Sequence, residues 1–117
     1  PFYNNLGKRL LQMPKLYFYD TGICASLLEI GDEKQMAHHP LRGLLMENLV
    51  VVELLKGRLN KGLRNNLYYW RDRTGNEIDI LLDLSGGAVP VEVKSSVTFH
   101  PDFLKGIRYW QKLNPQV

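Results

Sequence analysis

Three strand-like segments separated by turn sequences lie between residues 67 and 96, and they constrain the fold of this chain more than any other feature. The segments are LYYWR, EIDILLDL and VPVEVKSS, at 67–71, 77–84 and 89–96. Their β-branched and aromatic residues are typical of strands. DRTGN and SGGA connect them, and short connections that contain glycine favour hairpins. The pattern predicts an antiparallel meander, with Gly75 supplying a positive φ in the first turn.

The second predicted hairpin carries three charged side chains among apolar ones. Val89 and the valines at alternate positions after it share one face, which reads as ordinary core, whereas Glu92 and Lys94 share the other face. A turn at Gly86–Gly87, or a loop of all four SGGA residues, places Asp79 opposite Lys94 and diagonal from Glu92. A connection of odd length would send these groups to opposite faces. An even connection therefore predicts that Asp79, Glu92 and Lys94 converge.

Two neighbouring carboxylates repel each other unless a cation neutralises them, and this leaves two interpretations. In the first, the carboxylates of Asp79 and Glu92 hold Mg²⁺, which is commonly bound by one or two carboxylates together with water. Lys94 then positions the attacking water or stabilises developing charge, an arrangement suited to phosphodiester hydrolysis. In the second, the three side chains form a structural salt bridge. The spacing alone is compatible with both.

Helical patterns flank the predicted meander. Apolar periodicity predicts a long helix over 41–59, and Glu47 lies on its apolar side, where it requires a cation or hydrogen-bond donors nearby. Structural hydrogen bonding explains Glu47 as well as a functional role does. Elsewhere we expect an aromatic strand or extended segment at 15–20, a helix over 21–31 with Thr21 as its cap, a loop at 32–40 and a helix from about Pro101.

Length and composition indicate one folded domain over residues 1–117. Because the chain begins at Pro1 without an initiator methionine, we expect it to be a fragment of a longer protein, with residues 1–12 as the tail of a linker from an upstream domain or of a winged-helix region. The apolar runs are too short and too interrupted to span a membrane. Cys24 is the single cysteine and has no metal-type spacing around it, so the simplest setting is a reducing cytoplasm.

Basic residues cluster between residues 56 and 73, where Asp72 is the single acid. They are Lys56, Arg58, Lys61, Arg64, Arg71 and Arg73. Such a cluster can contact nucleic-acid phosphates. The alternative is a solvated helix end followed by a polar loop.

The order of these residues resembles a known superfamily. Asp79 and the Glu92-Val93-Lys94 triplet, preceded by a helical Glu47, resemble the PD-(D/E)XK nucleases, although Ile78 stands where the signature has proline. More specifically, four segments resemble, in order, the uncharacterised C-terminal domain of a large family of prokaryotic AAA-type ATPases. These segments are PKLYFYDTG, MENLVVVEL, YYWRDRTGNEIDILL and VPVEVKSS, and the resemblance covers nearly the whole chain.

The resemblance implies an α/β fold with a PD-(D/E)XK nuclease-like core, in which helices flank a central mixed β-sheet that contains an antiparallel meander. It implies that Asp79 and Glu92 bind Mg²⁺ or Mn²⁺, with the backbone carbonyl of Val93 as a further ligand. In the same way, it implies that Lys94 assists the hydrolytic water and that Glu47 completes or buttresses the site.

The function implied is Mg²⁺-dependent hydrolysis of nucleic-acid phosphodiesters, with Arg64, Arg71 and Arg73 as nucleic-acid contacts. The alternative is a non-catalytic accessory domain that binds DNA or protein within the ATPase. Because this chain lacks a GxxxxGK[ST] phosphate loop, ATP is expected only in the upstream domain. The predicted partners are DNA, the upstream ATPase domain and a second copy of the chain, with no membrane partner.

Overall fold

The structure is a computed structural model that describes residues 15–115 of the 117-residue chain. The described residues form two compact units. The sheet unit comprises residues 66–92 and 98–115, and the helical unit comprises residues 15–65 and 93–97. The linker predicted at residues 1–12 lies outside the described residues.

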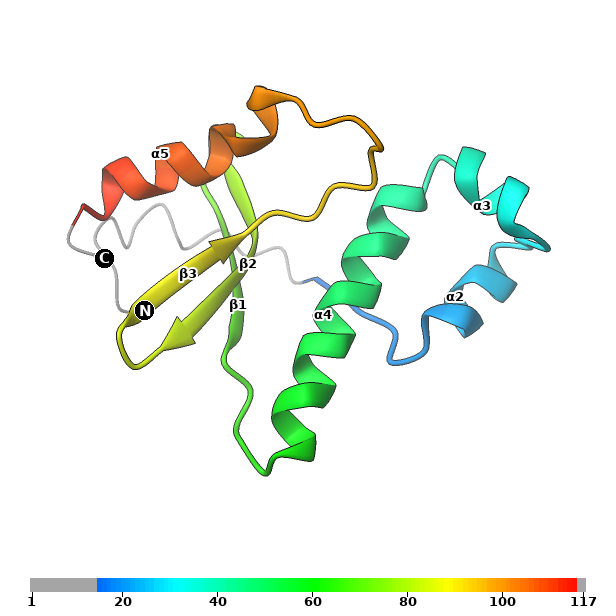
Figure 1. Ribbon diagram of the computed structural model, residues 1–117, viewed down its shortest axis with the longest axis horizontal. Helices are drawn as coiled ribbons and strands as arrows, with labels where there is room; N and C mark the ends of the chain where they lie inside the picture. The colour runs from blue at the N-terminus through cyan, green and yellow to red at the C-terminus, as the bar shows by residue number, and fades with distance from the viewer. Residues whose placement is uncertain (1–14, 116–117) are drawn as a thin grey trace. The chain divides into compact units, whose positions relative to one another are not determined.

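The sheet unit contains the predicted antiparallel meander, with strand order β1-β2-β3 (Figure 1). β1 (Leu67–Arg71) and β2 (Glu77–Leu84) have the predicted bounds. The prediction for the third strand was wrong at both ends, because β3 runs over Gly87–Val91 rather than 89–96. Val91 pairs with Ile80, and the chain leaves the ladder after this pair, so Glu92 and Lys94 follow the strand instead of belonging to it.

The register of the β2–β3 hairpin also differs from the prediction. Leu84 pairs with Gly87, so the turn consists of Ser85 and Gly86 rather than Gly86 and Gly87. Gly87 has a φ of 132°, which glycine adopts readily. The next positions after the last pair, Ile80 with Val91, are Asp79 and Glu92. The predicted register instead placed Lys94 opposite Asp79. The turn length is still even, but the pairing of β2 with β1 shifts register between the Tyr68–Leu81 and Trp70–Ile78 pairs, so regular alternation of faces does not continue through Asp79.

Asp72 organises the turn between β1 and β2. Its carboxylate accepts hydrogen bonds of 2.9–3.0 Å from backbone and side-chain donors of Thr74 and Asn76. Burial by itself raises the pKa of this carboxyl, but the donors of Asn76 and Thr74 outweigh burial and lower the pKa of Asp72 below its ordinary value. Gly75 has a φ of 92°, which confirms the positive φ predicted for this turn.

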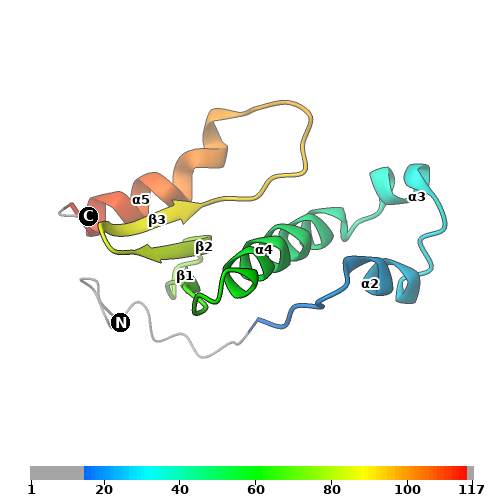
Figure 2. The same ribbon diagram turned by 60° about the horizontal axis from the view of Figure 1, so that its bottom comes forward.

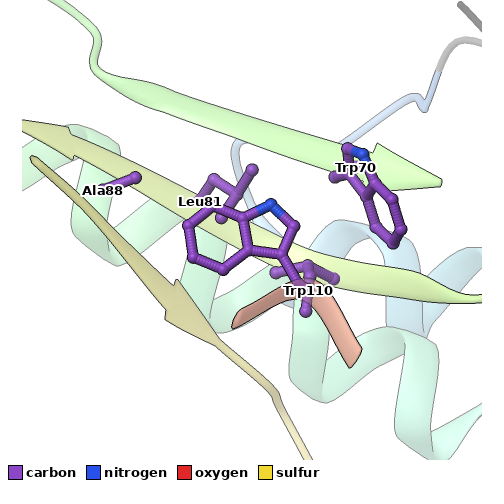
Figure 3. Close-up of a cluster of buried hydrophobic side chains, with 5 residues drawn as sticks. Trp70, Leu81, Ala88 and Trp110 are labelled. Carbon is purple, nitrogen blue, oxygen red and sulfur yellow. The ribbon is translucent and has the colours of Figure 1, made fainter. Parts of the chain in front are cut away.

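A helix covers the hydrophobic core of the sheet unit. α5 (Lys105–Leu113) follows the short 3₁₀ helix η1 (Pro101–Leu104), which agrees with the predicted start near Pro101. Figure 2 shows α5 running along the sheet, where it contacts β2. Trp110 is 2% exposed, and its indole lies over Leu81 in the buried cluster (Figure 3).

The face of β3 that packs in this cluster is not the predicted one. Ala88 belongs to the cluster and is 8% exposed, whereas Val89 is 43% exposed. Successive strand residues point to opposite faces, so the packing of Ala88 beneath α5 turns Val89 to the other side. The prediction that Val89 lies in the core was therefore wrong.

The helical unit is built on α4 (Arg42–Asn60), which α2 (Thr21–Leu27) and α3 (Glu33–His38) contact. α4 agrees closely with the helix predicted over 41–59. The loop predicted at 32–40 was wrong, because Asp32 caps α3 by accepting a hydrogen bond from the backbone N–H of Gln35 at 2.8 Å.

α2 differs from the helix predicted over 21–31 at both ends. Its cap is Asp20 rather than Thr21, since the Asp20 carboxylate accepts hydrogen bonds from the backbone N–H groups of Gly22 and Ile23. The helix stops before Glu29, whose φ of 60° is incompatible with a right-handed helix, and so ends well before residue 31.

Asn48 of α4 fixes the segment at residues 15–20. Its side chain accepts a hydrogen bond from the backbone N–H of Phe18 at 2.7 Å and donates to the carbonyl of Phe18 and the hydroxyl of Thr21, both at 2.9 Å. The amide thus pairs with both backbone groups of Phe18, as a neighbouring strand would. The segment itself has no strand assignment, so the extended alternative of the prediction holds.

The described elements make a small α/β fold with four α-helices and a three-stranded antiparallel sheet. The sequence predicted a mixed sheet, but all strand pairings within residues 15–115 are antiparallel. Among the helices in this part of the chain, none is both long and apolar enough to cross a membrane.

Candidate functional site

Asp79 and Glu92 are neighbours in the sheet unit. Asp79 lies on β2 and is 8% exposed, and Glu92 directly follows the last residue of β3. The Oε1 atom of Glu92 accepts a hydrogen bond from the backbone N–H of Asp79 at 3.2 Å. Val91, the residue before Glu92, pairs with Ile80, the residue after Asp79, so the two site residues lie next to each other at the end of the β2–β3 ladder. The structure therefore brings these two predicted site residues together.

Glu47 lies in the helical unit, and two residues of the 15–20 segment hold it. The Tyr17 hydroxyl donates a hydrogen bond to Oε2 of Glu47 at 3.0 Å, and Nζ of Lys15 lies 3.4 Å from the same oxygen. The Glu47 side chain is 13% exposed and that of Lys15 is 18% exposed. The mostly buried carboxylate thus has the cation and the donor that its position on the apolar side of α4 required.

Val93 and Lys94 belong to the segment at residues 93–97, which is part of the helical unit. The segment has no regular secondary structure, and Lys94 is exposed. Ser95 approaches the first turn of α4, with its hydroxyl 3.9 Å from the position that a Cβ on Gly43 would occupy. Glu47 lies one helical turn after Gly43. The four predicted catalytic residues therefore fall into two pairs, Asp79 with Glu92 in one unit and Glu47 with Lys94 in the other.

The predicted nucleic-acid contacts have different surroundings. Arg64 and Arg73 are exposed, whereas Arg71 pairs with Glu77 through hydrogen bonds of 3.1 Å from Nε and 2.9 Å from Nη2 to Oε2. The backbone carbonyl of Arg64 accepts a hydrogen bond from Nε of Arg58, which tightens the end of α4. Arg71 must therefore give up or share its carboxylate partner in order to contact a phosphate.

The donor chemistry of the Asp79–Glu92 pair suits a hard divalent cation. Mg²⁺ prefers oxygen ligands and often takes one or two carboxylates while keeping several waters. Oε1 of Glu92 accepts the N–H of Asp79, and a carboxylate has further acceptor positions on both oxygens. Within residues 15–115, no three side chains of His, Cys, Asp or Glu gather closely enough to hold a metal ion. The side chains of Asp79 and Glu92 supply carboxylate oxygens, which are the kind of ligand that Mg²⁺ prefers.

The sequence did not identify Lys15 and Tyr17 as the partners of Glu47, or Asn48 as the residue that holds the segment at 15–20. Asn48 was detectable, because it is a polar residue on an apolar stretch of the predicted helix, and it is 6% exposed. Lys15 and Tyr17 occupy alternate positions of an extended segment, which places both on one side of it. Their target lies about thirty residues away along the chain, and no local pattern specifies such a contact.

By its fold, the chain is a small α/β domain. Comparison with known families is more specific: the chain belongs to the family described as "Domain of unknown function (DUF4143)", whose model matches residues 42–117. This confirms the prediction of an uncharacterised prokaryotic domain. No solved structure matches the chain.

Two curated relatives are mycobacterial. The chain is 37% identical over 98 residues to the uncharacterized protein Rv2008c of Mycobacterium tuberculosis and to the uncharacterized protein Mb2031c of Mycobacterium bovis. The match covers 84% of this chain and 21% of each relative. The chain therefore corresponds to a C-terminal portion, about a fifth, of these larger proteins.

Proposed function

We propose that this domain is a PD-(D/E)XK nuclease-like module that hydrolyses nucleic-acid phosphodiesters with Mg²⁺ or Mn²⁺. The observation that carries the proposal is the pairing of Asp79 and Glu92, in which a mostly buried aspartate and the glutamate after β3 are joined by a 3.2 Å hydrogen bond. The hydrogen bond places the Glu92 carboxylate against the backbone of Asp79. A divalent cation bound by both side chains would neutralise the repulsion between the two carboxylates.

Each proposed role falls on a residue of this chain. Asp79, Glu92 and the carbonyl of Val93 are the proposed ligands, and the bound cation would neutralise charge on the phosphate. Lys94 is exposed and two residues after Glu92, and its proposed task is to orient the attacking water. Glu47, held by Tyr17 and Lys15, is the proposed buttress of the site. Arg64, Arg71 and Arg73 are the proposed phosphate contacts.

We place the domain, as part of the same proposal, at the C-terminal end of a prokaryotic AAA-type ATPase. Support comes from the curated relatives, whose chains are several times longer than the matched region. ATP would then bind in the upstream domain, and DNA would be the partner of the complete protein in the cytoplasm.

A second candidate function is a non-catalytic accessory domain that binds another protein. Large apolar side chains are exposed in the helical unit, and such surfaces commonly mark interaction sites. The most exposed are Val97 at 96%, Leu16 at 87%, Leu27 at 70% and Leu44 at 63%. In this function the Asp79–Glu92 pair would serve only to end the hairpin.

Cleavage assays separate the two candidates. The chain is incubated with single-stranded DNA, duplex DNA and RNA in Mg²⁺, in Mn²⁺ and in a chelator. The proposal predicts metal-dependent cleavage that falls about a hundredfold or more in Asp79→Asn and in Lys94→Ala, since each removes a group needed in the transition state. Cleavage that persists in Asp79→Asn, or the absence of metal-dependent cleavage of all three substrates, would favour the accessory domain.

A further inference from the structure

Gly106, in the first turn of α5, lies against the backbone of β2. A Cβ atom added at Gly106 would lie 2.6 Å from the backbone carbonyl oxygen of Glu77 and 3.9 Å from Oε1 of Glu92. Gly57 of α4, by comparison, has no atom within 4 Å of such a Cβ. The start of α5 therefore lies against the beginning of β2 and beside the carboxylate of Glu92, in a position where a larger residue does not fit.

The obstacle at Gly106 is backbone, and this decides the consequence of adding a side chain. A flexible side chain could move aside, but the Glu77 carbonyl belongs to the first residue of β2 and cannot rotate away independently. Ordinary non-bonded contact requires about 3.5 Å, so α5 would have to retreat by roughly 1 Å. Its first turn would then move away from Glu92.

The side chain of Glu92 lies where β3 ends against β2. The last pair of the β2–β3 ladder is Ile80 with Val91, and Glu92 is the next residue. Its carboxylate is placed between two parts of the sheet unit, the backbone N–H of Asp79 on one side and the Gly106 surface of α5 on the other. The position of that carboxylate relative to Asp79 is thus coupled to the seating of α5.

We infer that Gly106 is a positioning residue for the Asp79–Glu92 cation site: by lacking a side chain, it lets α5 seat against β2 and hold the Glu92 carboxylate beside Asp79. This inference rests on the proposed function, because it assigns Gly106 to the metal site named there. Gly106 itself contacts neither cation nor substrate. Metal ligands that lose a supporting neighbour typically lose about 10–100-fold in metal affinity, and this is the effect expected for Gly106→Ala.

The first test measures Mn²⁺ affinity from the electron paramagnetic resonance signal of the free ion, for the parent chain and two variants. Leu113→Ala is the matched control, because Leu113 also packs α5 on the core but lies about 10 Å further along the helix. Both substitutions disturb the seating of α5, but only Gly106→Ala does so beside Glu92. We expect Gly106→Ala to weaken Mn²⁺ binding about tenfold or more, while Leu113→Ala stays within about threefold of the parent.

A second test uses the parent chain and needs no folded variant. Mn²⁺ broadens the amide NMR signals of nearby residues steeply with distance, so substoichiometric Mn²⁺ should remove the Gly106 signal. Gly87 is the internal control, since it lies at the opposite end of the hairpin, about 17 Å from Asp79 at about 3.4 Å per residue. Loss of the Gly106 signal with a sharp Gly87 signal supports the inference.

The outcomes distinguish this inference from the function on which it rests. If the parent chain binds no Mn²⁺, the proposed function fails, and the inference fails with it. If the parent binds Mn²⁺ and loses the Gly106 signal but Gly106→Ala binds equally well, the inference alone is overturned. If the parent binds Mn²⁺ but its Gly106 amide stays sharp, the ion lies elsewhere, and the proposed site fails together with the inference. Equal loss of affinity in Gly106→Ala and Leu113→Ala would also overturn it, because the effect would then be general loss of packing.

Discussion

Replacing Asn48 with alanine should release the segment at residues 15–20 from α4. The substitution removes three hydrogen bonds and leaves the backbone N–H and carbonyl of Phe18 without the side chain that pairs with them. A typical intramolecular hydrogen bond contributes about 0.5–1.5 kcal/mol, which gives an upper limit of about 4.5 kcal/mol for three. Phe18 is 40% exposed, so water can replace part of this pairing. We therefore expect Asn48→Ala to lower the free energy of unfolding by about 2 kcal/mol.

Two assays test this value. In urea, a loss of about 2 kcal/mol lowers the unfolding midpoint by about 1 M if the slope is about 2 kcal/mol per molar. Trypsin cleavage after Lys15 reports opening of the segment itself, and the same free energy raises its rate about thirtyfold when opening precedes cleavage. Asn60→Ala, at the exposed end of α4, is the control and should change stability by less than about 0.5 kcal/mol.

The reasoning would be refuted if Asn48→Ala lowered the free energy of unfolding by less than about 0.5 kcal/mol and left the rate of cleavage after Lys15 unchanged. That result would mean that packing, rather than the amide of Asn48, holds the segment. The consequence reaches the candidate site, because Lys15 and Tyr17 of this segment are the residues that contact Glu47.

Three further predictions concern stability. Gly57→Ala, in the interior of α4 with open space around it, should stabilise the chain by about 0.5–1 kcal/mol in urea unfolding; a loss of stability would contradict this. Trp110→Ala should cost about 3–5 kcal/mol in the same assay, because the indole is almost completely buried, and a cost below about 1 kcal/mol would refute the assigned core. The pKa of Asp72 is lower in the folded chain, so its stabilising contribution is complete above the unfolded-state pKa of about 3.9 and is lost as the pH falls through the folded pKa. Asp72→Asn should therefore destabilise the chain at pH 7. In denaturation measured at several pH values, its free energy of unfolding should fall less on acidification than that of the parent; an equal fall in both chains would contradict this.

The positions of β1 and β2 could be predicted from sequence because local signals agreed there. Alternating apolar residues defined β2, and DRTGN supplied both a turn residue with positive φ and a capping aspartate between β1 and β2. The SGGA connection was less specific. Turns at Ser85–Gly86 and at Gly86–Gly87 are both of even length, so the sequence could not decide which residue of the third segment lies nearest Asp79.

Other features depended on contacts that local patterns do not encode. The partners of Glu47 come from a segment about thirty residues earlier, so the helix pattern showed that Glu47 needed a donor but could not identify Tyr17. Gly106 read as one glycine of an amphipathic helix, and its importance follows only from the packing of α5 on β2. α3 was missed for a different reason, since its polar composition outweighed the capping signal of Asp32.

The central claim is that Asp79 and Glu92 form a divalent-cation site, and calorimetric titration of Mn²⁺ tests it most directly. The titration compares the parent chain with Asp79→Asn and Glu92→Gln, which keep the side-chain shapes and, at Glu92, an acceptor for the N–H of Asp79. The account predicts saturable binding near one ion per chain in the parent and its loss in both variants, with all three chains folded. No binding to the parent, or equal binding to all three, would contradict it.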